Sequence, residues 1–351
     1  MGSGFWVVGV RFWVYFEKMA KKKNGNIITW IKEVTGRKAE GKAYKWLLPA
    51  EIGMMLYSLF TLLLIAFTYT SLPNAEDLIW WRIRIMLLTV AMWIVYRIWT
   101  CPLMNFARIL LLLLTLGWWY PDTYLLNRHF DNLDHIFAAW DQTIFGFQPA
   151  LVWSKAFPSP IVSEMMAMGY SLYFLMFVSL IAYIFIKRYG DFQKTAFIII
   201  TSFFVYYVIF DLLPVAGPQY YYLAVGTEEI AAGHFPALGT YFANHPECLP
   251  IPGWKEGLFH NLVQASHDAG ERPTAAFPSS HVGISTVTMI MAMRLRMWKY
   301  LLLWAVPYAF LCMGTVYLLP HYAVDAIAGF FTAIAIFLML EWIWKKAFAN
   351  K

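Results

Sequence analysis

Long apolar runs with few charges follow one another along the chain from residue 47 to residue 344. A helix crosses the roughly 30 Å hydrocarbon core of a bilayer with about 20 residues. Eight runs reach or approach that length, at 47–70, 79–98, 104–120, 161–186, 195–213, 282–297, 298–319 and 322–344. None shows the period-two alternation of a membrane β-strand, so the pattern predicts an all-α fold, a multi-pass transmembrane helical bundle of about six to eight spans.

The runs divide the chain into three regions. Residues 1–46 form a basic segment, which begins with an apolar stretch followed by lysines, the reverse of a signal peptide, and predicts an interfacial or short extra helix. Residues 47–160 hold the N-terminal transmembrane helices and an outer amphipathic segment. Residues 161–345 form a second transmembrane core, whose outer loop 214–277 is rich in Gly and Pro and is expected to cap an opening.

The composition agrees with a membrane protein. Hydrophobic residues make up 60% of the 351 residues and charged residues only 14%, whereas soluble domains carry about 25% charged residues. Trp and Tyr gather near the ends of the runs, in IWWRIR, GWWY, QYYY and EWIWKK, as interfacial aromatics do. Three cysteines are too few for a disulfide framework and do not indicate a redox compartment.

Basic residues predict the orientation of the bundle. If the N-terminus is cytoplasmic and all eight runs cross, 21 of the 27 Lys and Arg residues lie on the cytoplasmic side, together with both termini. This excess follows the positive-inside rule and explains the net charge of +6 without a nucleic-acid partner. All eight histidines then lie at the non-cytoplasmic (periplasmic or luminal) face.

Two histidine motifs stand at the outer starts of two late runs. In AAFPSSHVGIS, Ser279 or Ser280 is a suitable N-cap and His281 falls in the first helical turn. In LLPHYAVDAIAG, a proline at the first helical position would place His321 in the first turn, with Asp325 four residues on along the same face. The carboxylate would then accept the His321 ring N–H and leave the other ring nitrogen as a nucleophile.

Helix N-termini attract phosphate, and ionisable residues at membrane depth are costly enough to suggest function. A lone histidine near a span end is ordinarily just an interfacial polar residue. The paired motifs, 40 residues apart, instead predict a phosphate site at the outer surface, with His281, His321 and Asp325 as catalytic residues and Ser279 and Ser280 binding the substrate.

The motifs FPSSHVG and HYAVDAIAG resemble the second and third signature motifs of the type 2 phosphatidic acid phosphatase superfamily of membrane lipid phosphatases and phosphotransferases. The resemblance is best over 195–345 and implies a membrane phosphatase/haloperoxidase-type core. It also implies that His321 attacks phosphorus, that His281 protonates the leaving group and later acts as base, and that Asp325 orients the nucleophile. No metal or other cofactor is implied.

Two phosphate-clamping positions of the phosphatase members differ in this chain. Gly314 and Thr315 stand where those members carry Ser-Arg, and Arg272-Pro273 would need a lysine at position 265, which is Ala265. The stretches FDLLPVAGPQYYY and FDNLDHIFAAWDQTIFG, with HYAVD, instead resemble fungal inositol phosphorylceramide synthases and their bacterial relatives. Fewer cations suit a phosphodiester, which carries one negative charge, better than a phosphomonoester.

The predicted function is therefore a lipid phosphotransferase, an inositolphosphotransferase of sphingolipid metabolism in the resembling branch. It would move a phospho-head group from a phospholipid donor to a ceramide-like lipid alcohol acceptor. Tyr220, Tyr221 and Arg272 are further candidate substrate-binding residues, although the tyrosines equally fit an interfacial belt and Arg272 an ordinary loop charge. A phosphatase of the same superfamily is the alternative.

Two other classes fit less well. A transporter would use the histidines as a proton relay, but no inverted repeat or interrupted mid-membrane span is evident. A zinc site lacks short paired ligand spacing among its candidate residues, which are His245, Cys248, His260 and His267. The oligomeric state is not predicted.

Overall fold

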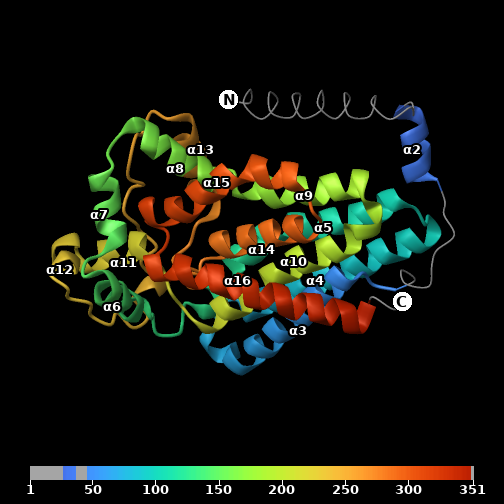
Figure 1. Ribbon diagram of the computed structural model, residues 1–351. Helices are drawn as coiled ribbons and strands as arrows, with labels where there is room; N and C mark the ends of the chain where they lie inside the picture. Colours follow the sequence, from blue (N-terminus) through green and yellow to red (C-terminus); the bar gives the residue numbers. More distant parts are fainter. Residues whose placement is uncertain (1–26, 37–45, 349–351) are drawn as a thin grey trace.

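The computed structural model describes residues 27–36 and 46–348 of the chain. Every regular element within these residues is a helix, which confirms the all-α prediction (Figure 1). The helix predicted near the N-terminus and most of the predicted segment 1–46 lie outside the described residues. Of that segment the structure describes chiefly α2 (Ile27–Thr35).

Six of the described helices are long and apolar enough to cross a membrane, which confirms a multi-pass bundle. They are α3 with the turn η2 (Pro49–Ser71), α4 (Ala75–Ile98), α5 (Pro102–Asn127), α10 (Tyr189–Leu212), α15 (Trp298–Tyr317) and α16 with the π-helical turn η4 (Ala323–Phe348). Their outward faces carry strongly exposed apolar side chains such as Phe67, Leu114 and Leu302. Lipid solvates such faces, whereas water would not.

Two of the predicted spans are interrupted or short. The run 161–186 divides at Leu172 into α8 (Pro160–Ser171) and α9 (Tyr173–Lys187), which meet at 45° and form a seventh span only as a bent pair. The run 282–297 forms α14 (Ser280–Arg294). Its 15 residues extend about 22 Å, less than the hydrocarbon thickness. Most of α14 is buried among α9, α10, α15 and α16.

Close packing at the centre of the bundle brings α14 against α10 and α16. The most apolar window of α10 is 72% buried, against 22% for α4, so α10 is central and α4 peripheral. Two glycines allow this approach. A Cβ on Gly329 would lie 2.5 Å from the Ser279 carbonyl oxygen, and one on Gly283 would lie 2.0 Å from the Tyr206 hydroxyl oxygen. Small residues at these contacts therefore set the two histidine-bearing segments side by side.

Two buried ion pairs join the N-terminal spans. Arg82 of α4 pairs with Asp122 of α5, and Arg108 of α5 pairs with Glu51 of α3. Both arginine side chains are fully buried, whereas the count of basic residues by side placed Arg82 at the outer face and Arg108 at the cytoplasmic face. A buried charge is costly unless it is paired, so each pair holds its two helices in register.

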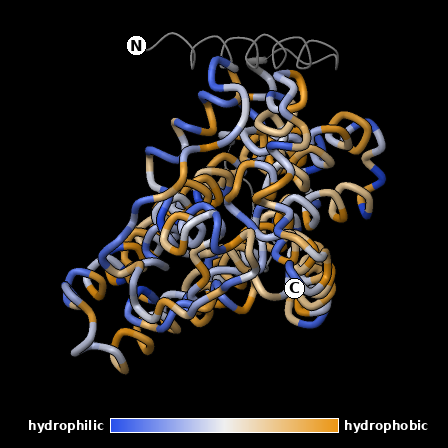
Figure 2. The backbone as a smooth tube through the Cα atoms, turned by 90° about the vertical axis from the view of Figure 1, so that its left-hand side faces the viewer, coloured by the Kyte–Doolittle hydropathy of each residue, from blue (hydrophilic) through white to orange (hydrophobic). Residues whose placement is uncertain are grey.

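The predicted outer segments gather at one end of the bundle, on the left in Figure 1. They form α6 (Asp134–Phe145), α7 (Pro149–Ala156), α11 (Pro218–Val225), α12 (Thr227–Ala231), η3 (Tyr241–Ala243) and α13 (Leu258–Gly270). Figure 2 shows hydrophobic residues along the bundle helices and many hydrophilic ones in the loops. Among these short helices, α6 contacts α16, which follows the second histidine motif, and α13 contacts α8.

Candidate active site

His281 and His321 lie next to each other beneath the outer segments. The Nε2 atom of His321 is 3.4 Å from the Nδ1 atom of His281, and the ring centroids are 5.6 Å apart. His321 is buried and His281 is half-buried. The fold thus brings two imidazoles from distant parts of the chain to one point.

His281 is positioned by the start of α14. Ser279 is the N-cap, and its Oγ accepts a hydrogen bond from the Val282 N–H at 3.4 Å, so His281 falls in the first helical turn. The His281 ring lies against Tyr170 and Tyr173, with centroids 4.5 Å away in each case. Ser279 and Ser280 are both buried, and the Ser279 hydroxyl serves the helix cap.

His321 is positioned differently from the prediction. The helix α16 begins at Ala323 with Tyr322 as its N-cap, so the placement of His321 in the first turn is wrong. Leu319 has a φ of 77°, which turns the chain before Pro320 and prevents a helical start there. His321 lies in the resulting loop, where its N–H donates to the Thr315 carbonyl at 3.1 Å.

The partner of the His321 ring is a backbone carbonyl. Its Nδ1 atom lies 2.7 Å from the Ala276 oxygen and 3.7 Å from Asp325 Oδ2. Asp325 therefore does not accept the ring N–H as predicted, because it instead accepts the Tyr322 N–H at 2.8 Å. With Nδ1 donating to Ala276, Nε2 keeps its lone pair and faces His281. Burial lowers the pKa of His321 to about 4, so this ring is neutral at neutral pH.

The N-terminus of α16 is already occupied by carboxylates. Asp325 accepts the Tyr322 N–H, and Asp141 of α6 accepts the Ala323 and Val324 N–H groups at 2.9 Å each. The phosphate cradle predicted at this helix start is therefore wrong, because three of its donors have protein acceptors. The carboxylates complement the helix dipole instead.

Asp134 is a second α6 carboxylate that the sequence analysis missed. It accepts the Ala216 and Gly217 N–H groups at 2.6 and 2.8 Å and the Tyr322 hydroxyl at 2.9 Å. Burial raises its pKa, although these hydrogen bonds oppose the shift. Asp134 and Asp141 are seven residues apart and share one helix face. The seven-residue spacing of these two aspartates in FDNLDHIFAAWDQTIFG could have indicated, from the sequence alone, that both carboxylates point to the same side of a helix.

A family model described as the PAP2 superfamily matches residues 135–339, more than half of the chain. The chain belongs to the PAP2 superfamily. Membership indicates an enzyme of the lipid phosphatase or phosphotransferase type. The matched residues include both histidine motifs and Asp141. Neither the curated proteins nor the solved structures gave a match.

Three further candidates of this PAP2 superfamily chain lie outside the histidine pair. Tyr220 and Tyr221 are buried on α11 and so do not form an exposed interfacial belt. The Tyr221 hydroxyl donates to the Pro236 carbonyl at 2.8 Å. Arg272 is exposed, and its guanidinium donates to the Glu271 carbonyl at 2.9 Å. The hydrogen bonds and ring contacts of the His281 and His321 side chains involve none of these three residues.

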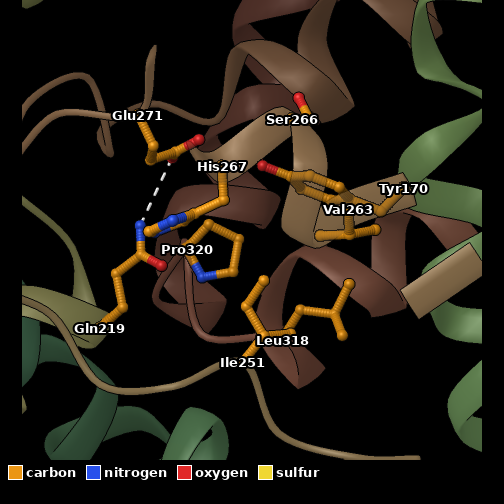
Figure 3. Close-up of a pocket in the computed structure, with 9 residues that line it drawn as sticks. All are labelled: Tyr170, Gln219, Ile251, Val263, Ser266, His267, Glu271, Leu318 and Pro320. Atoms are coloured by element: carbon orange, nitrogen blue, oxygen red, sulfur yellow. Dashed lines mark hydrogen bonds between the residues drawn. The ribbon is translucent and has the colours of Figure 1, made fainter. Parts of the chain in front are cut away.

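Beside the histidines of this PAP2 superfamily protein lies a small cavity of about 10 Å³. Figure 3 shows its walls, in which Tyr170 and Pro320 adjoin the two motifs and Gln219 points toward Glu271. Glu271 and Gln219 are polar residues that the motifs alone did not indicate.

Proposed function

We propose that this protein is a lipid phosphotransferase that moves a phospho-head group from a phospholipid to a lipid alcohol through a phosphohistidine at His321. The supporting observation is the ring geometry. His321 holds its Nδ1 against a carbonyl at 2.7 Å and presents Nε2 toward His281 at 3.4 Å. A buried neutral imidazole with a fixed tautomer suits a nucleophile, and an adjacent imidazole suits a general acid and base.

In the first step the Nε2 lone pair of His321 attacks the phosphorus of the donor phosphodiester. A P–N bond forms, the P–O bond to diacylglycerol breaks, and His281, which must gain a proton as the anionic donor binds, gives that proton to the departing oxygen. The phosphate enters by separating the two rings. Asp325 Oδ2, 3.7 Å from Nδ1, and the Ala276 carbonyl stabilise the positive charge that His321 gains.

In the second step His281 takes the proton of the acceptor hydroxyl, whose oxygen attacks the phosphohistidine. The P–N bond breaks and His321 returns to its neutral form. No metal has a role in this proposal. A phosphomonoester donor, with water in place of the lipid alcohol, would make the protein a phosphatase, so the two candidate activities share every residue named above.

The packing of the third-motif positions favours the transferase. Thr315, which replaces the arginine of phosphatase members, is fully buried, and its carbonyl accepts the His321 N–H. A Cβ on Gly314 would lie 2.6 Å from the Met166 oxygen of α8, so this position serves helix packing. Together with exposed Arg272, this leaves few cations for a dianionic phosphomonoester. The resembling motifs suggest phosphoinositol as the head group and a ceramide-like acceptor.

A transfer assay tests the proposal. Purified protein receives head-group-labelled phosphatidylinositol with or without ceramide, and His321→Ala should lose nearly all transfer. His234→Ala is the matched control, because His234 is exposed and its imidazole pairs with Glu229, away from the two motifs. In a parallel incubation with labelled phosphatidic acid, release of free phosphate, with no ceramide product from phosphatidylinositol, would favour the phosphatase. Lipid movement across vesicles without any new product would favour the transporter.

A further inference from the structure

The imidazole of His281 lies against two tyrosine rings. The Tyr170 ring is stacked on it, with the centroids 4.5 Å apart and an angle of 23° between the ring planes. The Tyr173 ring lies at the same centroid distance and is tilted by 46°. Tyr170 stands near the end of α8 and Tyr173 begins α9, so the break at Leu172 leaves one tyrosine on each helix. Both rings are close enough to His281 for a cation–π contact.

Packing fixes both tyrosines beside His281. Tyr170 is 9% exposed, and a Cβ on the preceding Gly169 would lie 2.3 Å from a backbone nitrogen of α15, so α8 and α15 touch backbone to backbone at this point. Tyr173 is 4% exposed and packs on Phe177, with the ring centroids 5.5 Å apart. The two rings therefore hold their places before any substrate binds.

The other titratable groups around His281 give little stabilisation to a proton on its ring. His321 faces it with Nε2 at 3.4 Å and is neutral at neutral pH, while Asp325 of α16 lies 3.7 Å from the other ring nitrogen of His321. From α10 and α15, the phenols Tyr206 and Tyr308 lie against α14. Burial, and after it the adjacent His321, lowers the pKa of His281 to about 3. The protonated ring therefore needs a favourable contact that these groups do not supply.

The face of an aromatic ring can supply that contact. It carries negative electrostatic potential, so it attracts a cation held over it, and the attraction is strongest where water is excluded. A neutral imidazole carries no net charge and gains less from the same position. Two tyrosine faces beside His281 therefore favour its protonated form over its neutral form. The anionic donor adds its own attraction once it binds, whereas the tyrosine rings are in place without it.

We propose that Tyr170 and Tyr173 are positioning residues that stabilise the protonated form of His281 through the faces of their rings. The inference rests on the proposed function, in which His281 gives a proton to the departing diacylglycerol oxygen. No bond to either tyrosine forms or breaks, and the proton stays on His281 until that oxygen takes it. The tyrosine hydroxyls have no part in this role, so phenylalanine can replace either residue.

Titration of the His281 ring tests the contact directly. The protein is labelled with ¹⁵N-histidine, its ring signals are followed by NMR in detergent without donor lipid, and His281→Asn identifies the signal. Tyr170→Leu and Tyr173→Leu should each lower the pKa of His281 by about 0.5–1.5 pH units. Tyr170→Phe and Tyr173→Phe should leave it unchanged. Tyr183→Leu is the matched control, because Tyr183 is an exposed tyrosine of α9.

The rate of the first step gives a second readout. Single-turnover release of diacylglycerol from phosphatidylinositol, without acceptor, depends on His281 as acid only. At pH 7 each leucine variant should release it about 3- to 30-fold more slowly, as the lowered pKa predicts, while the phenylalanine variants match wild type. Tyr170→pentafluorophenylalanine keeps the shape of the ring but reverses the sign of potential on its face. This variant should therefore behave like Tyr170→Leu.

The outcomes separate the two proposals. Equal pKa values of His281 in wild type and both leucine variants overturn the role of the rings, as does a loss in Tyr170→Phe as large as that in Tyr170→Leu. If the leucine variants do not fold, the fluorinated variant decides, because its ring fills the same space, and behaviour like that of Tyr170→Phe overturns the role. If wild type and His321→Ala release diacylglycerol equally, the proposed function fails, and the titration still decides the ring contact.

Discussion

Replacing Asp141 best distinguishes an effect on the position of His321 from an effect on the stability of the folded protein. Its two carboxylate oxygens accept the Ala323 and Val324 N–H groups at 2.9 Å each and so fix the first turn of α16. Asp325 lies in that turn, and His321 stands just before it. In Asp141→Asn the side chain keeps one acceptor oxygen and turns an NH₂ group toward the second N–H. The start of α16 should therefore shift, and His321 with it.

Two effects of Asp141→Asn on stability nearly cancel. Losing one hydrogen bond to a charged acceptor costs about 1.5–3 kcal/mol. Burial, opposed by the two N–H groups, raises the pKa of Asp141 from an ordinary 3.8 to about 6. A shift of about two units means that the ionised side chain disfavours the folded state by about 3 kcal/mol at neutral pH. Because Asn carries no charge, we expect a net change in unfolding free energy within about 2 kcal/mol.

The pH dependence follows from the same shift. The folded-state pKa of Asp141 lies above the unfolded value, so its contribution favours folding below about pH 4 and is lost as the pH rises through about 6. Transfer activity should rise as the pH increases through about 6, because protonation of Asp141 weakens the hydrogen bonds that it accepts from Ala323 and Val324 at the start of α16. His321 does not add to this inflection, since its pKa is lowered to about 4.

The assay compares thermal unfolding and transfer kcat of purified protein between pH 5 and 8. At pH 7, Asp141→Asn should unfold within about 4 °C of wild type, while kcat falls about tenfold to a hundredfold because the nucleophile is displaced. The kcat inflection near pH 6 should disappear. Asp131→Asn, an exposed carboxylate before α6, should change neither quantity. Full kcat in Asp141→Asn, or a loss that only tracks the unfolded fraction, refutes the reasoning.

Three further predictions concern packing and topology. Gly329→Ala should lower the free energy of unfolding by about 1–3 kcal/mol through overpacking. Gly190→Ala is the control and should leave stability unchanged, because no atom lies within 4 Å of the new Cβ. Equal unfolding temperatures for the two variants would contradict this prediction. Arg82→Met should lower the free energy of unfolding by about 3–5 kcal/mol, because it leaves the Asp122 carboxylate unpaired. Adding Asp122→Leu should restore most of that stability. A double variant no more stable than Arg82→Met would contradict the ion-pair account. In oriented vesicles, a protease outside should cut the loop between α12 and α13 and spare a C-terminal tag, and the reverse pattern inverts the topology.

The sequence predicted the helical class and most of the spans because length and apolarity decide them. It did not reveal the break at Leu172, since 161–186 reads as one continuous run in which Glu164 is the single charged residue. The structure packs α8 against α15 and α13. The sequence also did not distinguish α14 from a full span. The count of basic residues placed Arg82 and Arg108 at the membrane faces, and it could not show that they are buried, because their partners Asp122 and Glu51 lie on other helices.

The histidine pair could be proposed from two local motifs, but the groups that hold it are distant in sequence. The Ala276 carbonyl is a backbone atom, and no residue type signals its role. Asp141 reaches α16 across 182 residues, so its capping contact depends on the tertiary fold. Leu319 has a left-handed φ that a leucine rarely adopts, which is why the start of α16 was predicted too early.

The central claim is that His321 carries the phospho-head group between donor and acceptor. The direct measurement is mass spectrometry of wild-type protein quenched within one turnover after mixing with phosphatidylinositol in the absence of acceptor. We predict a phosphoinositol adduct on His321 alone, which disappears when ceramide is added. Product formation with no adduct on any residue, or an adduct on a residue other than His321, would contradict the account.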